Sequence, residues 1–343
     1  MFDILTIIGT RPQFIKASPV SNAFKKNNIN EVIIDTGQHY DFNMSEIFFK
    51  ELSIQAPKHN LNIGSQSHAI QTSEIISKLE PIIINEKPNA ILVYGDTNST
   101  LGAAITAAKL NITLIHIEAG LRSFNKEMPE EINRIITDHM SNLLFCPSIN
   151  SKNNLSDENI QNNTFVVGDV MYDIFKKFHS YFDAKNKYGD YALLTMHRAE
   201  NTTPTILQKR LKQISKIKMK FIYPLHPRTK QIIINNRISL PNNIMTINPI
   251  GWFDLMKLGK NSKFIITDSG GLQKESLWLK KYCITIRNET EWIETINQGV
   301  NKINTIDDEL SIPETSIGDF QNPYGDGKAA EKITEIIINT LKR

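Results

Sequence analysis

Short apolar segments alternate with longer amphipathic segments along nearly the whole chain of 343 residues, and this alternation is the strongest constraint on its fold. Alternating strands and helices are typical of parallel sheets that carry helices on both faces. The apolar segments fit strands that are buried on both sides. We expect strands at residues 4–8, 32–35, 90–94, 113–117, 143–146, 165–167, 192–195, 221–223, 244–247, 264–266 and 283–286. Helices are expected between them, for example at 14–25, 67–86, 99–109 and 130–141.

The length of the chain predicts two domains. The segment 165–167 reads as the last strand of the first half, and the polar residues 185–191 precede a fresh series of strands and helices. We therefore expect an α/β protein with Rossmann-like domains at residues 1–168 and 169–326, and a ligand in the cleft between them. The last segment, 327–343, is predicted to be an amphipathic helix that is capped by Asp326 and packs back on the N-terminal domain.

Charge and cysteine content exclude several classes of protein. Lys and Arg number 39 against 36 Asp and Glu, which is too balanced to indicate nucleic-acid binding. Cys146 and Cys283 are the only cysteines and form no CxxC pair, so neither a disulfide framework nor a zinc site is expected. No apolar segment approaches the roughly 18 residues of a membrane span, and the N-terminus has no basic leader. We expect a cytoplasmic protein without membrane contact.

The motif Asp268-Ser269-Gly270-Gly271 separates an apolar segment from a helix start. A strand that ends in Ser-Gly-Gly and turns into a helix offers backbone N–H groups to an anion, and glycines let a phosphate come close. Glu275 follows one helical turn later, where its carboxylate suits the two hydroxyls of a ribose. The motif predicts a nucleotide diphosphate site, and a glycine-rich turn with a serine cap is an equally good interpretation of these residues alone.

Basic residues and histidines follow other predicted strands. Arg11 lies at the turn after the first strand, and Lys16 follows about one turn into the next helix. His197 and His226 each follow a strand of the second half with an arginine close by. Arg287 follows the last expected strand, where it reaches either a phosphate or the acids of the next helix. Such residues are often structural when alone, but their place at strand ends favours an anionic ligand.

Three carboxylates stand at comparable places in the first half. Asp96 follows the strand at 90–94, Glu118 follows the strand at 113–117, and Glu130 begins a helix. Because the carboxyl ends of parallel strands share one edge of a sheet, we expect these acids to lie close together. Several acids around one sugar carbon suit proton transfer in both directions. Turn, cap and helix-dipole roles are the alternative interpretation.

Taken together, these motifs resemble the non-hydrolysing UDP-N-acetylglucosamine 2-epimerase family. The resemblance covers nearly the whole chain, and the order and spacing of the motifs are highly specific. The motifs are Gly9-Thr-Arg-Pro12, Gly95-Asp-Thr97, His116-Ile-Glu-Ala-Gly-Leu-Arg122, Pro129-Glu-Glu131, His197-Arg198, His226, Asp268-Ser-Gly-Gly271 and Asn322-Pro-Tyr-Gly-Asp-Gly327. The resemblance implies a fold like that of GT-B glycosyltransferases. It also implies inversion of C2 of a UDP-2-acetamido sugar, without NAD, a metal or another cofactor, by anti elimination of UDP and its re-addition to a 2-acetamidoglucal.

The resemblance further implies roles for single residues and a homodimer. The catalytic set would be Asp96, Glu118, Glu130 and His197, with the division of roles among the three acids left open. Arg11 and Lys16 would contact the diphosphate and sugar together with His197. Other substrate-binding residues would be His226, Ser269, Gly270, Gly271, Glu275 on the ribose, and Arg287.

The chain departs from the best-known members of that family at two places. Trp292 replaces an arginine that helps bind UDP, and Arg287 is expected to compensate. Gln38-His39-Tyr40 replaces the Gln-His-Arg of regulated bacterial members, which puts their allosteric second substrate site in doubt. Segments such as Gly168-Asp-Val-Met-Tyr172 also resemble epimerases of UDP-2,3-diacetamido-2,3-dideoxyglucuronate, which is the alternative substrate. A GT-B glycosyltransferase and a nucleotide-sugar sensor without turnover are the alternatives from other classes.

Overall fold

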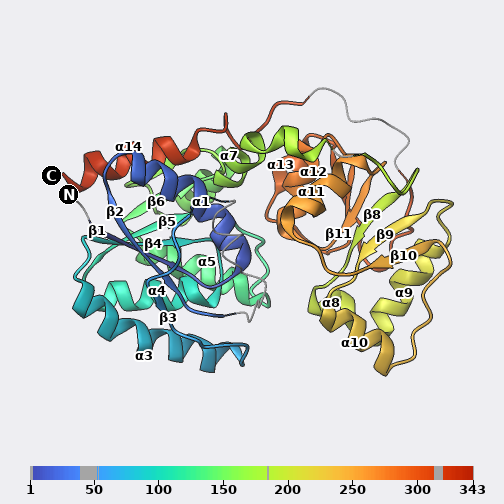
Figure 1. The fold of residues 1–343 in the computed structure, drawn as a ribbon, viewed down its shortest axis with the longest axis horizontal. Coiled ribbons are helices and arrows are strands. Elements are labelled where there is room, and N and C mark those ends of the chain that lie inside the picture. Colours follow the sequence, from blue (N-terminus) through green and yellow to red (C-terminus); the bar gives the residue numbers. More distant parts are fainter. Residues whose placement is uncertain (1–2, 39–51, 53, 184, 313–319, 343) are drawn as a thin grey trace. The chain divides into compact units, whose positions relative to one another are not determined.

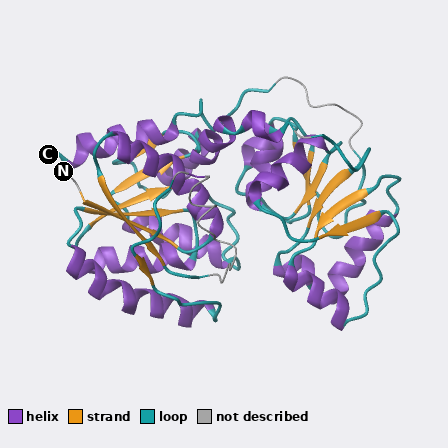
Figure 2. Cartoon of the chain, in the orientation of Figure 1, coloured by secondary structure: helices purple, strands orange, loops and turns teal. Residues whose placement is uncertain are grey.

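The computed structural model describes residues 3–38, 52, 54–183, 185–312 and 320–342. The chain divides into two compact units, one of Met1–Lys177 with Pro323–Arg343 and one of Phe178–Asn322. Helices and strands alternate along both units (Figure 2). Within the described ranges, no helix is both long and apolar enough to cross a membrane.

The first unit is built on a seven-stranded parallel sheet in the order β3-β2-β1-β4-β5-β6-β7. Its central strands consist of apolar residues that are buried on both faces, as expected for a parallel sheet covered on both sides. The strands are β1 (Asp3–Ile8), β2 (Asn30–Asp35), β3 (His59–Asn60), β4 (Ala90–Tyr94), β5 (Thr113–Ile117), β6 (Leu143–Cys146) and β7 (Thr164–Val166).

Helices cover both faces of this sheet (Figure 1). They are α1 (Arg11–Lys26), α3 (His68–Glu86), α4 (Asn98–Lys109), α5 (Pro129–Met140), α6 (Ile149–Asp157), α7 (Val170–Lys177) and α14 (Ala329–Leu341). α1, α7 and α14 lie on one face, and α3 and α4 lie on the other. Apolar residues of α3 and α4 pack on the sheet to form the core of that side, among them Ile75, Leu79, Ala103 and Ala107.

The second unit contains a six-stranded parallel sheet in the order β10-β9-β8-β11-β12-β13. The strands are β8 (Ala192–Thr195), β9 (Phe221–Pro224), β10 (Ile244–Ile247), β11 (Ile265–Thr267), β12 (Cys283–Thr285) and β13 (Asn301–Ile303). The helical segments are η1 (His179–Phe182), α8 (Ala199–Thr202), α9 (Pro204–Ser215), α10 (Pro227–Asn235), α11 (Trp252–Asn261), α12 (Gly270–Trp278) and α13 (Ile293–Asn297). Cys146 and Cys283 are buried free thiols, one in each sheet.

Both sheets have the same strand order. The chain runs from β1 outward to β3 and then returns to β4 beside β1, and it runs in the same way from β8 to β10 and back to β11. In sheets of this kind, ligands bind beyond the carboxyl ends of the strands at the point where the order reverses. Ligand contacts are therefore expected at the ends of β1 and β4 in the first unit and of β8 and β11 in the second.

The C-terminal helix belongs to the first unit. α14 packs on α1 and α7, so the first unit runs through Lys177 rather than ending at the expected residue 168. It resumes at Pro323, a few residues before the expected start of the C-terminal segment.

The expected cap of this helix at Asp326 is wrong. Lys328 takes the N-cap position of α14 without a side-chain cap. Asp173 of α7 instead accepts hydrogen bonds from the backbone N–H groups of Ala329 and Ala330, at 3.1 and 2.8 Å. A carboxylate from a neighbouring helix therefore satisfies the amides that begin α14, a long-range contact that no local sequence pattern announces.

Candidate active site

A lysine and a glutamate meet where β4 and β5 end. Lys16 of α1 forms an ion pair with Oε2 of Glu118, the residue that follows β5. Both side chains lie over Gly95, because a Cβ atom at that glycine would lie 3.4 Å from Lys16 Nζ and from Glu118 Oε2. The structure thus brings two sequence-predicted site residues together beside Asp96, at the point of the first sheet where the strand order reverses.

Glu118 has an unusual backbone conformation. Its φ of +74° lies in the left-handed region, which residues other than glycine seldom adopt and which stores strain. The turn is anchored on β6, because the N–H groups of Glu118 and Ala119 both donate to the carbonyl oxygen of Phe145, at 3.1 and 3.0 Å. Such strain is concentrated at functional sites in proteins, which agrees with the role expected for Glu118.

Asp96 is held by Arg134 of α5. Nε and Nη2 of Arg134 both donate to Oδ2 of Asp96, at 3.1 and 2.6 Å. The side chain of Asp96 is 31% exposed, whereas the side chain of Arg134 is 3% exposed. Asp96 does not cap α4, because Thr97 takes that position and accepts a hydrogen bond from the N–H of Thr100. The cap interpretation of Asp96 is therefore wrong, and its carboxylate remains accessible beside Glu118.

The two neighbouring acids at the start of α5 have different environments. Glu130 is half-buried, and no hydrogen bond or ion pair links it to another residue in the part of the chain that the structure describes. Glu131 is buried and accepts hydrogen bonds from the N–H groups of Ser123 and Phe124, both at 2.9 Å. Glu131 is thus a structural acid, whereas Glu130 keeps its carboxylate available.

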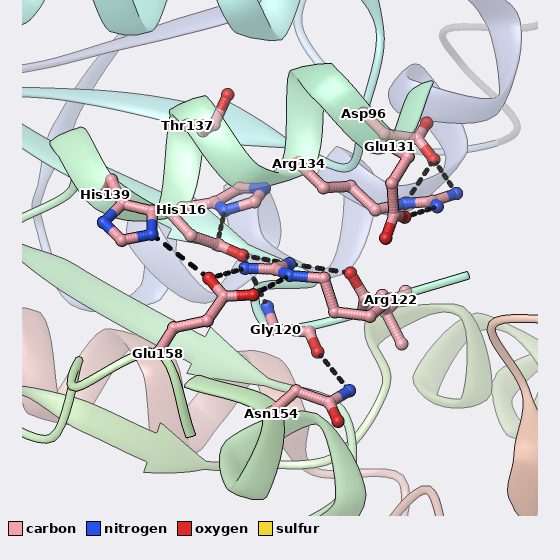
Figure 3. A network of polar contacts seen from close by, with 12 residues as sticks. Asp96, His116, Gly120, Arg122, Glu131, Arg134, Thr137, His139, Asn154 and Glu158 are labelled. Atoms are coloured by element: carbon pink, nitrogen blue, oxygen red, sulfur yellow. Dashed lines mark hydrogen bonds and ion pairs between the residues drawn. The ribbon is translucent and has the colours of Figure 1, made fainter. Parts of the chain in front are cut away.

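A buried polar network joins β5, the turn that follows it and α5 (Figure 3). His116 is placed between Oδ1 of Asp138, at 2.7 Å, and the carbonyl oxygen of Gly95, at 2.8 Å. Both neighbours can accept a hydrogen bond from the imidazole. Asp138 also accepts from the N–H of Gly120, at 3.0 Å, and from Arg122, at 2.7 Å.

The charges of this network balance each other. Burial raises the pKa of Asp138, but His116 and Arg122 outweigh burial and hold that pKa below its usual value. Arg122 is in turn bound by Glu158 through Nε and Nη2, at 2.6 and 2.8 Å, and this bond lowers the pKa of Glu158. The network therefore fixes the backbone at two points near Glu118, namely at Gly95 and at Gly120.

In the second unit, Asp268 organises the ends of β8 and β11. Its carboxylate is fully buried, and Oδ2 accepts from the N–H groups of His197 and Arg198, at 2.8 and 2.9 Å. Oδ1 lies 3.2 Å from Nδ1 of His197. The aspartate thus positions both the backbone and the ring of His197.

The second predicted histidine lies close by. His226 is exposed, and its ring nitrogen accepts a hydrogen bond from the N–H of Arg228 as the N-cap of α10. The ring centroids of His197 and His226 are 6.1 Å apart. The structure therefore gathers both histidines at adjacent strand ends, at the reversal of the second sheet.

The expected helix start after β11 is confirmed. Ser269 is the N-cap of α12 and accepts a hydrogen bond from the N–H of Leu272, at 3.4 Å. Gly270 and Gly271 are the first residues of the helix. A Cβ atom at Gly270 would clash with Oε1 of Glu291, so a larger residue here would require the Glu291 side chain to move. Phosphate binding by this turn stays a prediction.

The remaining predicted residues have partners of their own. Glu275 accepts a hydrogen bond from the indole N–H of Trp252, at 2.7 Å, and is largely buried. The guanidinium of Arg287 is buried and lies 3.0 Å from Oε2 of Glu291, so of the two sequence interpretations the pairing with local acids is the one found. A phosphate contact of Arg287 stays a prediction. Arg11 is half-buried at the first position of α1.

Trp292 is a packing residue. It is buried, and the ammonium of Lys274 lies 4.2 Å from the centroid of its ring. A cation at this distance from an indole is attracted by the face of the ring. Trp292, where the resemblance led us to expect an arginine, thus has a positive charge nearby, supplied by α12.

Comparison with known proteins identifies the family. The model for UDP-N-acetylglucosamine 2-epimerase matches residues 22–338. The chain belongs to the UDP-N-acetylglucosamine 2-epimerase family. It is 44% identical to a UDP-N-acetylglucosamine 2-epimerase homolog of Methanococcus maripaludis, over 98% of this chain and 99% of the relative. It is also 42% identical to the UDP-2,3-diacetamido-2,3-dideoxy-D-glucuronate 2-epimerase of Pseudomonas aeruginosa, over 97% and 99%.

Solved structures agree with this assignment. The Methanocaldococcus jannaschii UDP-GlcNAc 2-epimerase in complex with UDP-GlcNAc and UDP superposes with a TM-score of 0.89, at 39% identity, over 98% of this chain and 99% of that one. A spinosyn rhamnosyltransferase superposes with a TM-score of 0.50 at 9% identity, which concerns the fold alone. The epimerase therefore has a GT-B-like fold of two parallel α/β sheets.

Several residues of this epimerase were missed from the sequence. Arg134, Asp138, Trp252 and Asp268 hold the predicted site residues in place, yet only Asp268 belongs to a recognisable motif. A mid-helix charge or an aromatic residue gives no local signal of its distant partner. The expectation about regulation rests on His39 and Tyr40, which lie outside the described residues. No cluster of three or more acids, histidines or cysteines suited to a metal occurs within the described ranges.

Proposed function

We propose that this epimerase interconverts UDP-N-acetylglucosamine and UDP-N-acetylmannosamine by inverting C2 of the sugar. The observation that carries the proposal is the meeting of Glu118 and Lys16 over Gly95, with the accessible carboxylate of Asp96 on the next residue. Inversion at C2 requires a proton to leave one face of the sugar and another to arrive on the opposite face. More than one acid near one carbon suits that requirement.

In the first step, a carboxylate of the first unit takes the C2 proton. The electron pair of the C2–H bond forms the C1=C2 double bond, and the pair of the C1–O bond leaves with UDP, which gives a 2-acetamidoglucal. In the second step, a UDP oxygen adds back to C1 while C2 receives a proton on the other face. Sugar and UDP are conserved, and only the hydrogen at C2 exchanges with solvent.

The departing diphosphate needs positive partners, because negative charge grows on it as the C1–O bond breaks. Lys16 and Arg11 of α1, His197 after β8, and the N-terminus of α12 at Ser269–Gly271 are the groups that we propose for this role. Glu275 is proposed to bind the ribose, since its carboxylate lies one turn into α12, with Oε1 3.9 Å from the position of a Cβ at Gly271. No cofactor takes part in this scheme.

One alternative substrate has specific support. The relative from Pseudomonas aeruginosa is named for UDP-2,3-diacetamido-2,3-dideoxy-D-glucuronate and is 42% identical over 97% of this chain. The same elimination and re-addition would apply to that sugar. Turnover of both UDP-sugars, measured side by side on the same preparation, separates the two substrates.

The proposal is tested in deuterated water. Incubation with UDP-N-acetylglucosamine should place deuterium at C2 of the product and of recovered substrate, and the Glu118→Gln variant should place little. If neither candidate sugar gained deuterium at C2, the proposed function would be refuted. Homodimer formation and a cytoplasmic location stay predictions.

A further inference from the structure

Helix α5 carries a row of charged residues on its buried side. Glu131, Arg134 and Asp138 are spaced three and four residues apart, so they share one face of the helix. Their exposed fractions are 1%, 2% and 1%. Buried charges are costly unless they are paired, and each of these three is paired with a group near the proposed proton-transfer acids.

Arg134 forms the link to Asp96. Two of its nitrogens bind Oδ2 of Asp96, and Nη1 binds Oε2 of Glu131 at 2.8 Å. Glu131 in turn holds the backbone of Ser123 and Phe124. The orientation of the Asp96 carboxylate is therefore set by a buried guanidinium that is itself fixed at a second point.

Asp138 forms the matching link to the turn of Glu118. It binds the N–H of Gly120, two residues after Glu118, and the ring of His116, two residues before it. Since His116 also binds the carbonyl oxygen of Gly95, the turns that carry Asp96 and Glu118 are both tied to α5 (Figure 3).

We propose that Arg134 is a positioning residue that occupies one oxygen of Asp96 and presents the other oxygen to C2 of the sugar. This inference rests on the proposed function and adds to it a role for one acid of the three. Among the described residues, nothing binds Oδ1 of Asp96, and the side chain is accessible. Glu118 has a different partner, Lys16, so each of the two acids has a cation of its own.

The charged groups around Asp96 come from three elements. Arg134 and Glu131 face it from α5. Glu118 at the end of β5 and Lys16 of α1 both lie close to Gly95, the residue before Asp96. His116 is hydrogen-bonded to the carbonyl oxygen of Gly95. Arg134 is the only one of these that donates hydrogen bonds to the Asp96 carboxylate, within the residues that the structure describes.

The test compares Arg134→Met with Arg134→Lys and with Arg210→Met in the full-length protein. Arg210 is an equally buried arginine of the second unit that binds Asn304 and Thr305, so its variant controls for the loss of a buried arginine. We expect Arg134→Met to lower kcat on the order of a hundredfold while KM changes by less than about threefold. Arg134→Lys should recover part of the rate, and Arg210→Met should keep the wild-type kinetics.

Two outcomes would overturn the inference. One is a kcat of Arg134→Met within about threefold of wild type. The other is a loss of rate matched by an equal loss of UDP-binding sites in calorimetry, which would mean that the arginine only maintains the fold. If Arg134→Met does not fold, Arg134→Lys, which loses the two-nitrogen contact with Asp96, must by itself lower kcat without a comparable change in KM. C2 exchange by the wild type is measured first, so that failure of the proposed function is seen separately.

Discussion

Lys16 on the second turn of α1 is ion-paired with Glu118, 102 residues later in the chain, directly over the glycine that follows β4. The pair joins a residue that the sequence assigns to the diphosphate with one that it assigns to proton transfer. A UDP-sugar whose phosphates bind Lys16 would therefore break this ion pair and leave the Glu118 carboxylate available for proton transfer.

Replacement of Lys16 tests that relationship. We expect Lys16→Met to raise KM and to lower kcat, each on the order of tenfold or more, because both a phosphate contact and the partner of Glu118 are lost. Steady-state kinetics with UDP-N-acetylglucosamine give both values. Lys26→Met, in the last turn of the same helix, is the control and should behave as wild type. Equal kinetics in the two variants would exclude Lys16 from the site.

Loss of charge should affect activity at Glu118 and stability at Glu131. Glu118→Gln is expected to lower C2 exchange on the order of a hundredfold or more, the usual effect of losing a general base, with a small change in Tm. Glu131→Gln removes a buried acceptor of backbone N–H groups and should lower stability by about 1–3 kcal/mol. Deuterium exchange and thermal unfolding, measured on both variants, check the contrast. A Glu131 variant with wild-type stability would contradict the structural role.

His197 and Asp268 should act as one unit. His197→Ala is expected to lower turnover on the order of a hundredfold, because a donor to the leaving diphosphate is lost. Asp268→Asn should lower turnover as well, since the aspartate holds the ring and the N–H of His197. The double variant should be much less impaired than the product of the two single effects. Unchanged kinetics in His197→Ala would remove that residue from the site.

Low pH should weaken the buried network of Asp138, His116 and Arg122. The pKa of Asp138 is lowered in the folded protein, so its contribution to stability is present above the unfolded pKa of about 4 and is lost as the pH falls through the folded value. We expect the Tm of the wild type to drop steeply below about pH 4. Asp138→Asn should be less stable at pH 7 and should show a flatter dependence over the same range. Parallel curves for the two proteins would contradict this assignment.

Much of the fold follows from the sequence because buried parallel strands are apolar throughout. β4, β5, β6, β8 and β10 begin and end at the expected residues. β3 and β13 were not predicted, because both are edge strands of only two or three residues. An edge strand can carry polar side chains, such as His59 and Lys302, and therefore lacks the apolar pattern of the central strands.

The site was predictable only in part. Asp96, Glu118, His197 and His226 follow strands, and parallel topology brings such residues to one edge of each sheet. Arg134 and Asp138 act from the middle of a helix on turns far away in sequence, so their partners are decided by packing. Arg287 had two plausible partners, and only the packing of Glu291 beside it showed which is bound in the folded chain.

The position of α14 bears on the order of events during synthesis. The last helix completes the unit that the first helix began, whereas the residues of the second unit are contiguous from Phe178 to Asn322. On a ribosome, the second unit can finish folding while the first still lacks a helix, the reverse of the usual N-terminal-first order. Limited proteolysis of stalled nascent chains would reveal this sequence of events. Loss of α14 would then damage the unit that starts with β1.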